Sequence, residues 1–458
     1  MKTPKTHIRN HLTFGQKRLV VALVVVFALV VPIQSPFMVA ASSTPTEATI
    51  VLQTADATLL PGTFQVVNNE GGNQTNPHVD CDIVSYTYDD LGQSIIHYQD
   101  LSTGLDTEIP GNAVDLLSDV SGSHVAFTQV TNDGDTIRIF DTISQTTTVV
   151  PGFWNSNPSI GGGLVAFEER DSIENSQPSN IATYDFSTGT VTQLTNDSFA
   201  NRNPEVSPNG DVVTWQKCQS NLVTCDIYAA IQTAPGVFTT TALTTDGNSS
   251  PYKSATNGEL AVYISNRTGE HDIYYQPVTG GNEVHLSIPG DQRDATISGD
   301  LISFESGTDH GYDTFVYDIR SGKIYQVTNS LPDEKLSQLS VCGDTGRIVY
   351  LTVGNGGFDV LAFTFQVPSV PSNTQDQLND LIALIRSFNL PAGTANSLIR
   401  KLQNAIDALN ASDMATGCSL LTSFINECQA QSGKKLTPTQ STQLINSANQ
   451  IKTSIGCP

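Results

Sequence analysis

Two short acidic segments are the places where residue types and spacing most directly suggest ligand chemistry. Asp133 and Asp135 lie on either side of Gly134, and Asp309 and Asp313 enclose a second segment that contains a glycine. Paired carboxylates on a glycine-bearing turn can bind Ca²⁺, a cation that prefers oxygen ligands. Asp and Gly also form tight turns without any metal, and neither segment matches a complete calcium-loop motif. We predict no cofactor, with calcium at these four aspartates as the alternative.

Signatures of common catalytic sites are missing from the sequence. It contains neither the Gly-x-Ser-x-Gly turn of serine hydrolases nor the His-Glu-x-x-His pair of zinc proteases. Six histidines beyond residue 41 fall at unrelated positions: His78, His97, His124, His271, His285 and His310. We therefore predict no catalytic residue and expect most of these histidines to be surface or strand residues. A cluster of them at one site is the alternative.

The first 41 residues indicate the compartment. Residues 1–18 contain five basic residues and no acidic one, and an apolar run follows from Leu19 to Val31. This run is shorter than the roughly 20 residues that cross a bilayer comfortably. We predict a signal peptide over residues 1–41, with an uncleaved membrane anchor as the alternative. The remaining chain is then exported, to the medium, the cell surface or the periplasm, without a membrane span.

The charged residues argue against nucleic acid as a partner and indicate a domain boundary in the chain beyond residue 41. The sequence has 22 Lys and Arg against 45 Asp and Glu, a net charge of −23, which argues against binding nucleic acid through general electrostatics. Residues 42–368 hold 11 basic and 40 acidic residues, whereas residues 369–458 hold six and five. We therefore predict a domain boundary, with a Pro- and Ser-containing linker at residues 367–372.

A short apolar segment recurs along the first of these regions, with starts about 40 to 50 residues apart. The seven copies are residues 83–86, 125–127, 165–167, 212–215, 260–263, 301–304 and 348–350. Each is typical of a buried strand, and most are followed by a second strand. An Asp–Gly turn then follows in several copies, as at Asp185 and Gly189 or Asp318 and Gly322. These aspartates are predicted to stabilise turns.

Four short strands in a repeat of about 40 residues predict a β-propeller. The repeat resembles the WD40-like unit of TolB-type propellers, with the best matches at 157–195, 203–244 and 294–328. We place the propeller at residues 62–366, after a lead-in at 42–61. It has seven blades, or six if one segment is a chance match. The segment Thr63–Asn69 is predicted to supply the missing outer strand of the last blade.

After the linker the apolar period changes from 2 to 3.6, which predicts four short helices in a small bundle over residues 373–458. Thr437, Pro438 and Gln440 form a typical helix start. The segments 405–409, 420–425 and 430–437 resemble the FIMAH-type helical module found at the C-terminal ends of exported proteins. That resemblance implies export and an accessory or surface role, without catalytic residues.

All seven cysteines lie beyond residue 41, where an exported protein can oxidise them. Cys218 and Cys225 bracket a turn inside one repeat, and Cys81 and Cys342 occupy matching positions in the first and last repeats. The predicted disulfides are Cys81–Cys342, Cys218–Cys225 and Cys418–Cys457, which leaves Cys428 as a buried thiol. Zinc binding is the rival interpretation, but the sequence has no Cys-x-x-Cys pair.

These features favour a secreted or cell-surface propeller that binds an extracellular or envelope protein or polysaccharide, without catalysis and as a monomer. Propellers present rigid faces built of loops, which are common binding surfaces. One alternative is an extracellular polysaccharide lyase or glycosidase whose site is in the channel, since such enzymes use paired carboxylates. A structural envelope or adhesion component is another. The fold alone does not decide among them.

Overall fold

The structure is a computed structural model. It describes residues 48–54, 57–111, 114–152, 154–170, 178–219, 224–247, 253–308, 311–329, 334–353, 357–368, 374–388, 390–411 and 413–457. The predicted signal peptide, most of the predicted linker and Asp309 lie outside these residues.

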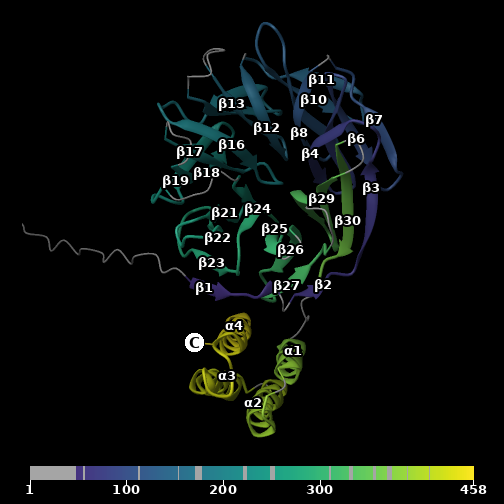
Figure 1. Cartoon of the computed structure of the whole chain (residues 1–458). Helices are drawn as coiled ribbons and strands as arrows, with labels where there is room; N and C mark the ends of the chain where they lie inside the picture. Colours follow the sequence, from purple (N-terminus) through teal and green to yellow (C-terminus); the bar gives the residue numbers. More distant parts are fainter. Residues whose placement is uncertain are drawn as a thin grey trace, which may run out of the picture. The chain divides into compact units, whose positions relative to one another are not determined.

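The strands that the structure describes form a seven-bladed β-propeller, which confirms the larger of the two predicted blade numbers (Figure 1). Blades 1 to 3 are β4 (Asn73–Asp80), β5 (Ile83–Asp90), β6 (Gln93–Asp100), β7 (Leu105–Glu108); β8 (Asp115–Ser121), β9 (His124–Gln129), β10 (Thr136–Asp141), β11 (Thr146–Val149); and β12 (Asn155–Gly161), β13 (Leu164–Glu169), β14 (Asn180–Asp185), β15 (Thr190–Gln193). Blades 4 and 5 are β16 (Ala200–Val206), β17 (Val212–Cys218), β18 (Cys225–Ala234), β19 (Val237–Ala242); and β20 (Ala255–Thr256), β21 (Leu260–Ser265), β22 (Asp272–Pro277), β23 (Val284–Ser287). Blade 6 is β24 (Gln292–Ser298), β25 (Leu301–Thr308), β26 (Gly311–Asp318), β27 (Lys323–Gln326), and blade 7 contains β28 (Lys335–Cys342), β29 (Thr345–Val353) and β30 (Phe358–Gln366).

The recurring apolar segments are the second strands of the blades. Val165, Ala166 and Phe167 on β13 are fully buried, although successive side chains point to opposite faces of the sheet. Both faces of a blade are covered because each blade packs against its two neighbours. A continuous apolar run instead of an alternating pattern is therefore what these strands require.

The innermost strands carry a bulge that explains the Asn-Pro pairs of the repeat. Asn76, Asn157, Asn203 and Asp294 have φ between 47° and 54°, in the left-handed region. The pairing register of β4, β12, β16 and β24 with the next strand shifts at these residues. Asn and Asp tolerate this conformation better than other side chains. The bulge turns the following residues of each strand toward the centre of the propeller.

The Asp–Gly turns are structural, as the sequence predicts. Asp185 Oδ1 accepts hydrogen bonds from the Ser187 hydroxyl (2.6 Å) and amide (2.7 Å), and Gly189 has φ +66°. These hydrogen bonds, that of the hydroxyl foremost, lower the pKa of Asp185.

We expect Asp185→Ala to lower the free energy of unfolding by about 1 kcal/mol, because it removes these acceptors from the turn. Urea unfolding of the purified chain measures the change. Asp185→Asn is the matched control and loses less, since its amide oxygen still accepts. Equal stability of the alanine variant and the wild type would contradict this role.

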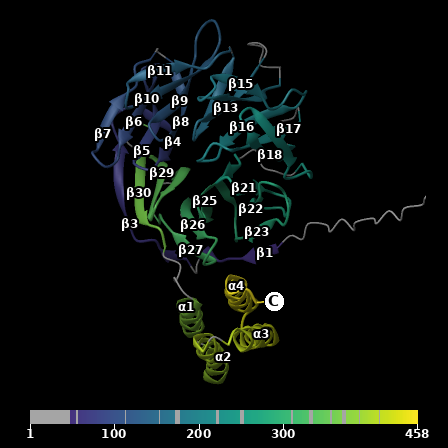
Figure 2. The ribbon, with the colours of Figure 1, turned by 180° about the vertical axis from the view of Figure 1, so that it is seen from behind.

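The N-terminal segment closes the ring and then covers two more blades. β3 (Gly62–Asn68) pairs antiparallel with β30 as the outer strand of blade 7, which confirms the predicted closure. Just before it, β1 (Ala48–Val51) pairs parallel with β23, and β2 (Thr58–Leu59) pairs parallel with β27. Figures 1 and 2 show these purple strands beside teal and green strands that come much later in the propeller sequence. The lead-in thus protects the edges of blades 5 and 6.

Four helices follow the propeller: α1 (Thr374–Ser387), α2 (Ala392–Asn410), α3 (Met414–Gln431) and α4 (Pro438–Ser454). Their apolar faces form a core of their own that includes Leu381, Leu402 and Phe424. α4 begins with the predicted capping box, in which Thr437 and Gln440 exchange side-chain and backbone hydrogen bonds. In the described part of the chain, none of the helices has the length and apolar content needed to cross a membrane.

Candidate functional site in the central channel

The innermost strands of the seven blades surround a central channel, each in contact with the innermost strands of its neighbours. One position of each innermost strand is equivalent in the pairing register, because it lies opposite the same place on the second strand. In six of the seven described strands this residue also directly follows a shift in register. We call these seven residues the channel ring: His78, Asp119, Ser159, Glu205, Ala255, Thr296 and Gln338. The repeated blades thus place seven different residues at equivalent positions around the channel.

Three members of the channel ring hold neighbouring blades together. Gln338 Oε1 accepts a hydrogen bond from the Val79 amide of blade 1 (2.7 Å). Asp119 Oδ2 accepts one from the Ile160 amide of blade 3 (2.8 Å). Ser159 Oγ likewise accepts one from the amide that follows Glu205 in blade 4 (3.0 Å). These three side chains therefore have a structural role.

Glu205 forms no such bond between blades in the described residues, whereas His78 also forms a hydrogen bond with the backbone of Ser118 in blade 2. His78 Nδ1 lies 3.1 Å from the carbonyl oxygen of Asn76, which belongs to its own strand. Both side chains line a cavity of about 230 Å³ at the channel. The polar lining residues of this cavity are Asn76, His78, Glu205, Lys253, Ser254, Asp294, Thr296, Lys335 and Gln338. Five apolar residues complete the lining: Pro77, Ala255, Ala295, Leu336 and Leu351. The cavity can therefore accept a ligand that has both polar groups and apolar surface.

Burial in the channel changes the ionisation of its carboxyl groups. It raises the pKa of Glu205 to about 8, and the neighbouring charge of Asp119 acts in the same direction against the opposing effect of Lys253. Burial also raises the pKa of Asp294, which Lys253 partly counteracts. Burial lowers the pKa of His78, although Asp119 opposes this shift. At neutral pH the cavity thus contains a protonated Glu205 beside a neutral imidazole.

Titratable groups with shifted pKa values in one cavity are typical of functional sites. A protonated carboxyl group can donate a hydrogen bond or a proton, and a lysine can neutralise an anion. We therefore identify the cavity around Glu205, His78 and Lys253 as the candidate functional site. Sequence reasoning missed these residues, although the repeated Asn-Pro pairs could have located the channel ring.

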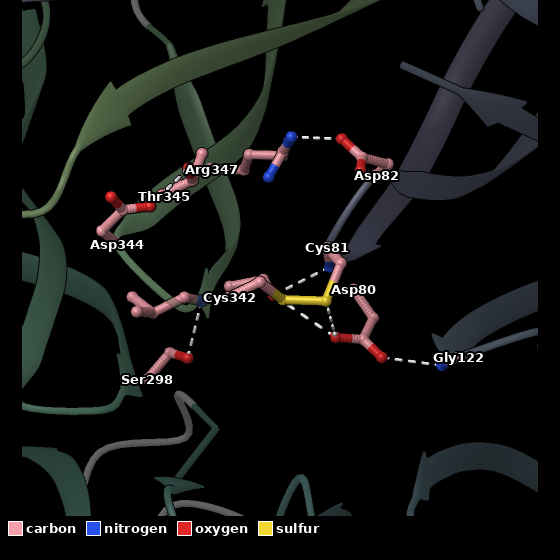
Figure 3. The surroundings of a disulfide bond; sticks show 11 residues. Asp80, Cys81, Asp82, Gly122, Ser298, Cys342, Asp344, Thr345 and Arg347 are labelled. Atoms are coloured by element: carbon pink, nitrogen blue, oxygen red, sulfur yellow. Dashed lines mark hydrogen bonds and ion pairs between the residues drawn. A yellow bond between two sulfur atoms is a disulfide. The ribbon is translucent and has the colours of Figure 1, made fainter. Parts of the chain in front are cut away.

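The structure contains three disulfides, and they join the three cysteine pairs named from the sequence. Cys81 follows the innermost strand of blade 1 and Cys342 ends the innermost strand of blade 7, so this disulfide crosses the closure of the ring (Figure 3). The Cys81 amide donates to Ser340 Oγ of blade 7 (3.0 Å). Arg347 of blade 7 pairs with Asp82 of blade 1. The joint between first and last blades is therefore covalent, hydrogen-bonded and ionic.

The other two disulfides are local. Cys218 and Cys225 lie directly opposite each other on β17 and β18. Cys418 on α3 is joined to Cys457, beyond the end of α4.

Cys428 is a free, buried thiol, and burial raises its pKa to about 12. Asp80 lies close to Cys81 and Cys342, the one cluster of three potential metal ligands among the described residues, but both sulfur atoms there belong to the disulfide.

Of the described histidines, His78 lies at the channel and His97 on another strand of the same blade, whereas His124 belongs to blade 2 and both His271 and His285 belong to blade 5. His97 pairs with Asp106 at 2.9 Å, and His285 pairs with Asp272 at 3.1 Å. His310 lies outside the described residues. The described histidines therefore do not form one cluster.

The calcium candidates lie in two different blades. Asp133 is exposed in the turn between β9 and β10, and Asp135 follows it, with its pKa raised by burial. Asp313 is buried within β26, opposite Ser306, so it belongs to a strand and not to the turn itself. Calcium binding at these aspartates stays a prediction.

No protein-family model and no curated protein matches the sequence. Solved structures share the propeller fold. The chain is similar to the β-propeller domain of the Trilobed protease from Pyrococcus furiosus, with 10% identity over 66% of this chain and 97% of that one and a TM-score of 0.48. It is also similar to TolB from Acinetobacter baumannii, with 16% identity over 71% and 95% of the two chains and a TM-score of 0.37.

A further similarity is to an oligogalacturonate lyase from Vibrio parahaemolyticus, with 11% identity over 69% of this chain and 99% of that one and a TM-score of 0.47. The chain spans about half the length of an acylaminoacyl peptidase that it matches, 52% of that protein. At these identities the similarities concern the fold, which is shared by proteins with different activities.

Proposed function

We propose that the protein is an exported propeller that binds an extracellular polysaccharide or protein without acting on it, through a polar group that enters the central channel. The observation that carries this proposal is the cavity of about 230 Å³ in which His78, Glu205 and Lys253 come together. Glu205 forms no hydrogen bond between blades in the described residues, so ring closure does not account for it. Binding sites are commonly concave, with a few polar groups that orient the ligand.

Export is supported by the basic and apolar N-terminal sequence and by disulfides, which persist in oxidising compartments. We assign the four helices, which resemble a FIMAH-type module in sequence, an accessory or surface role. In the alternative function, a structural envelope or adhesion component, the near-neutral helices would be the part that contacts a partner.

A binding measurement with a blocked channel tests the proposal. Ligands are selected with the purified chain from carbohydrate arrays and from peptides of the culture medium, and their affinity is then measured by calorimetry. Lys335→Trp places a large ring at the cavity and should weaken binding at least tenfold. Lys434→Trp, on an exposed residue of the helical region, is the matched control. Unchanged affinity of the Lys335 variant would place the ligand elsewhere.

The alternative function is a polysaccharide lyase or glycosidase, and one observation favours it. Glu205 is protonated at neutral pH beside Asp119, whose carboxylate accepts two backbone hydrogen bonds, from Val120 and Ile160. A protonated carboxyl group close to a second carboxyl group is an arrangement that acid catalysis of glycoside cleavage uses. Turnover of a bound polysaccharide, measured as new chain ends and abolished in Glu205→Gln, would establish the enzyme and reject the binding protein.

A further inference from the structure

The propeller as a whole is strongly acidic, but two lysines line its channel cavity. Residues 42–368 contain 40 acidic and 11 basic residues, so most basic side chains should find a carboxylate. Five of them do so within the propeller: Arg170, Lys217, Arg267, Arg320 and Arg347. Lys253 and Lys335 form no ion pair with any carboxylate that the structure describes, and both line the cavity.

Burial favours the uncharged form of two carboxyl groups near these lysines. Glu205 has its pKa raised to about 8, so it is mostly uncharged, and the pKa of Asp294 is also raised by burial. The two carboxyl oxygens of Asp119 accept backbone hydrogen bonds from Val120 and Ile160. Lys335 Nζ also lies over the Phe358 ring, 4.4 Å from its centroid. The cavity is therefore lined by two lysines that form no ion pair with a described carboxylate.

The remaining lining of the cavity indicates what kind of anion fits. Ser254, Thr296 and Gln338 contribute hydroxyl and amide groups, and no aromatic side chain belongs to the described lining. Hydroxyl and amide groups exchange hydrogen bonds with sugar hydroxyls. The cavity is also lined by the apolar residues Pro77, Ala255, Ala295, Leu336 and Leu351, which can contact the C–H groups of a sugar ring. A protonated Glu205 adds one more hydrogen-bond donor.

We propose that the channel cavity binds a sugar acid of an extracellular polysaccharide, with Lys253 and Lys335 as partners of its carboxylate and the polar ring residues as partners of its hydroxyls. This inference rests on the proposed binding function and narrows it to uronate-containing chains. The rest of the acidic propeller repels such a chain, so binding should be confined to the cavity.

Calorimetry with the full chain at low ionic strength tests the inference. The probes are a uronate tetrasaccharide, a neutral glucose tetrasaccharide of the same length and a peptide with a free C-terminal carboxylate. We expect the uronate to bind at least tenfold more tightly than either of the others. Lys253→Met should weaken uronate binding about tenfold, and the matched control, Lys434→Met at an exposed position in the turn between α3 and α4, should leave it unchanged.

The outcomes separate this inference from the proposed function. Equal binding of the uronate and neutral probes, or no effect of Lys253→Met, overturns the sugar-acid assignment and leaves a glycan-binding channel in place. Tight binding of the peptide alone overturns the sugar assignment as well. If no glycan or peptide binds, both the inference and the proposed function are wrong. Each variant is checked by thermal unfolding, so a folding defect is not counted as a loss of binding.

The pH dependence of uronate affinity gives a second readout. A Lys253 with only a structural role would not produce this dependence. Above about pH 8 Glu205 becomes charged beside Lys253, so uronate affinity should fall as the pH rises from 6 to 9. Glu205→Gln, which cannot ionise, should lose much of this fall with pH. The other groups that face the cavity are His78, Asp119, Asp294, Lys253 and Lys335. A pH profile identical in wild type and Glu205→Gln would overturn the role of Glu205.

Discussion

Replacing Cys81 and Cys342 by serine should lower the free energy of unfolding by about 5 kcal/mol, the largest stability change expected from any single disulfide here. The two cysteines are 261 residues apart, and cross-linking such distant residues restricts the unfolded chain strongly. The same disulfide joins the first and last blades, where β3 completes blade 7 through non-covalent pairing. Without it, only this pairing and contacts such as Arg347–Asp82 close the ring.

The matched control is the double serine variant of Cys218 and Cys225. These cysteines are seven residues apart and already face each other across one hairpin, so about 2 kcal/mol is expected. Urea unfolding under non-oxidising, metal-free conditions measures both variants. A loss in the Cys81/Cys342 variant no larger than in the control would show that strand pairing alone holds the ring closed.

Glu305→Gln should stabilise the protein at pH 9 and leave its stability nearly unchanged at pH 4. Burial raises the pKa of Glu305 from its ordinary value of 4.5 to about 8, and the charge of Asp294 adds to the shift. The folded state therefore holds a proton that the unfolded chain releases above about pH 4.5. The contribution is present at low pH and is lost as the pH rises from about 4.5 to about 8.

The size of this effect follows from the shift. One unit of pKa corresponds to about 1.4 kcal/mol, so the wild type should lose up to about 5 kcal/mol relative to Glu305→Gln by pH 9. The glutamine oxygen can still accept the hydrogen bond from the Leu336 amide that Glu305 accepts. Thermal unfolding from pH 4 to pH 9 measures the difference, with exposed Glu259→Gln as the control. Parallel stability curves for wild type and Glu305→Gln would contradict the shift.

The sequence predicted the blades and their closure because both depend on local, repeated patterns. The apolar segments that begin at Val165, Val212 and Leu301 become second strands of blades, and residues 62–68 become the missing outer strand. The cysteine pairs could be named for the same reason, because matching positions in the first and last repeats become neighbours once the ring closes. The four helices followed from their period, length and capping residues.

The strands β1 and β2 could not be predicted. They are short, they do not resemble the repeat, and each pairs with a strand more than 200 residues away. Such pairing depends on the edges that blades 5 and 6 leave open once the ring has formed. From the sequence, residues 42–61 could therefore be described only as a lead-in to the propeller, with no predicted structural role.

The candidate site also depends on tertiary structure. His78, Glu205 and Lys253 belong to different repeats and form no motif, and their common position appears only when seven innermost strands surround one channel. Their ionisation is likewise a property of the folded state, since burial sets the pKa of Glu205. The sequence by itself determined the propeller, its closing strand and its helices, because local period and repetition specify them. Only the tertiary structure decided where chemistry is possible, because proximity and burial arise from the closed ring.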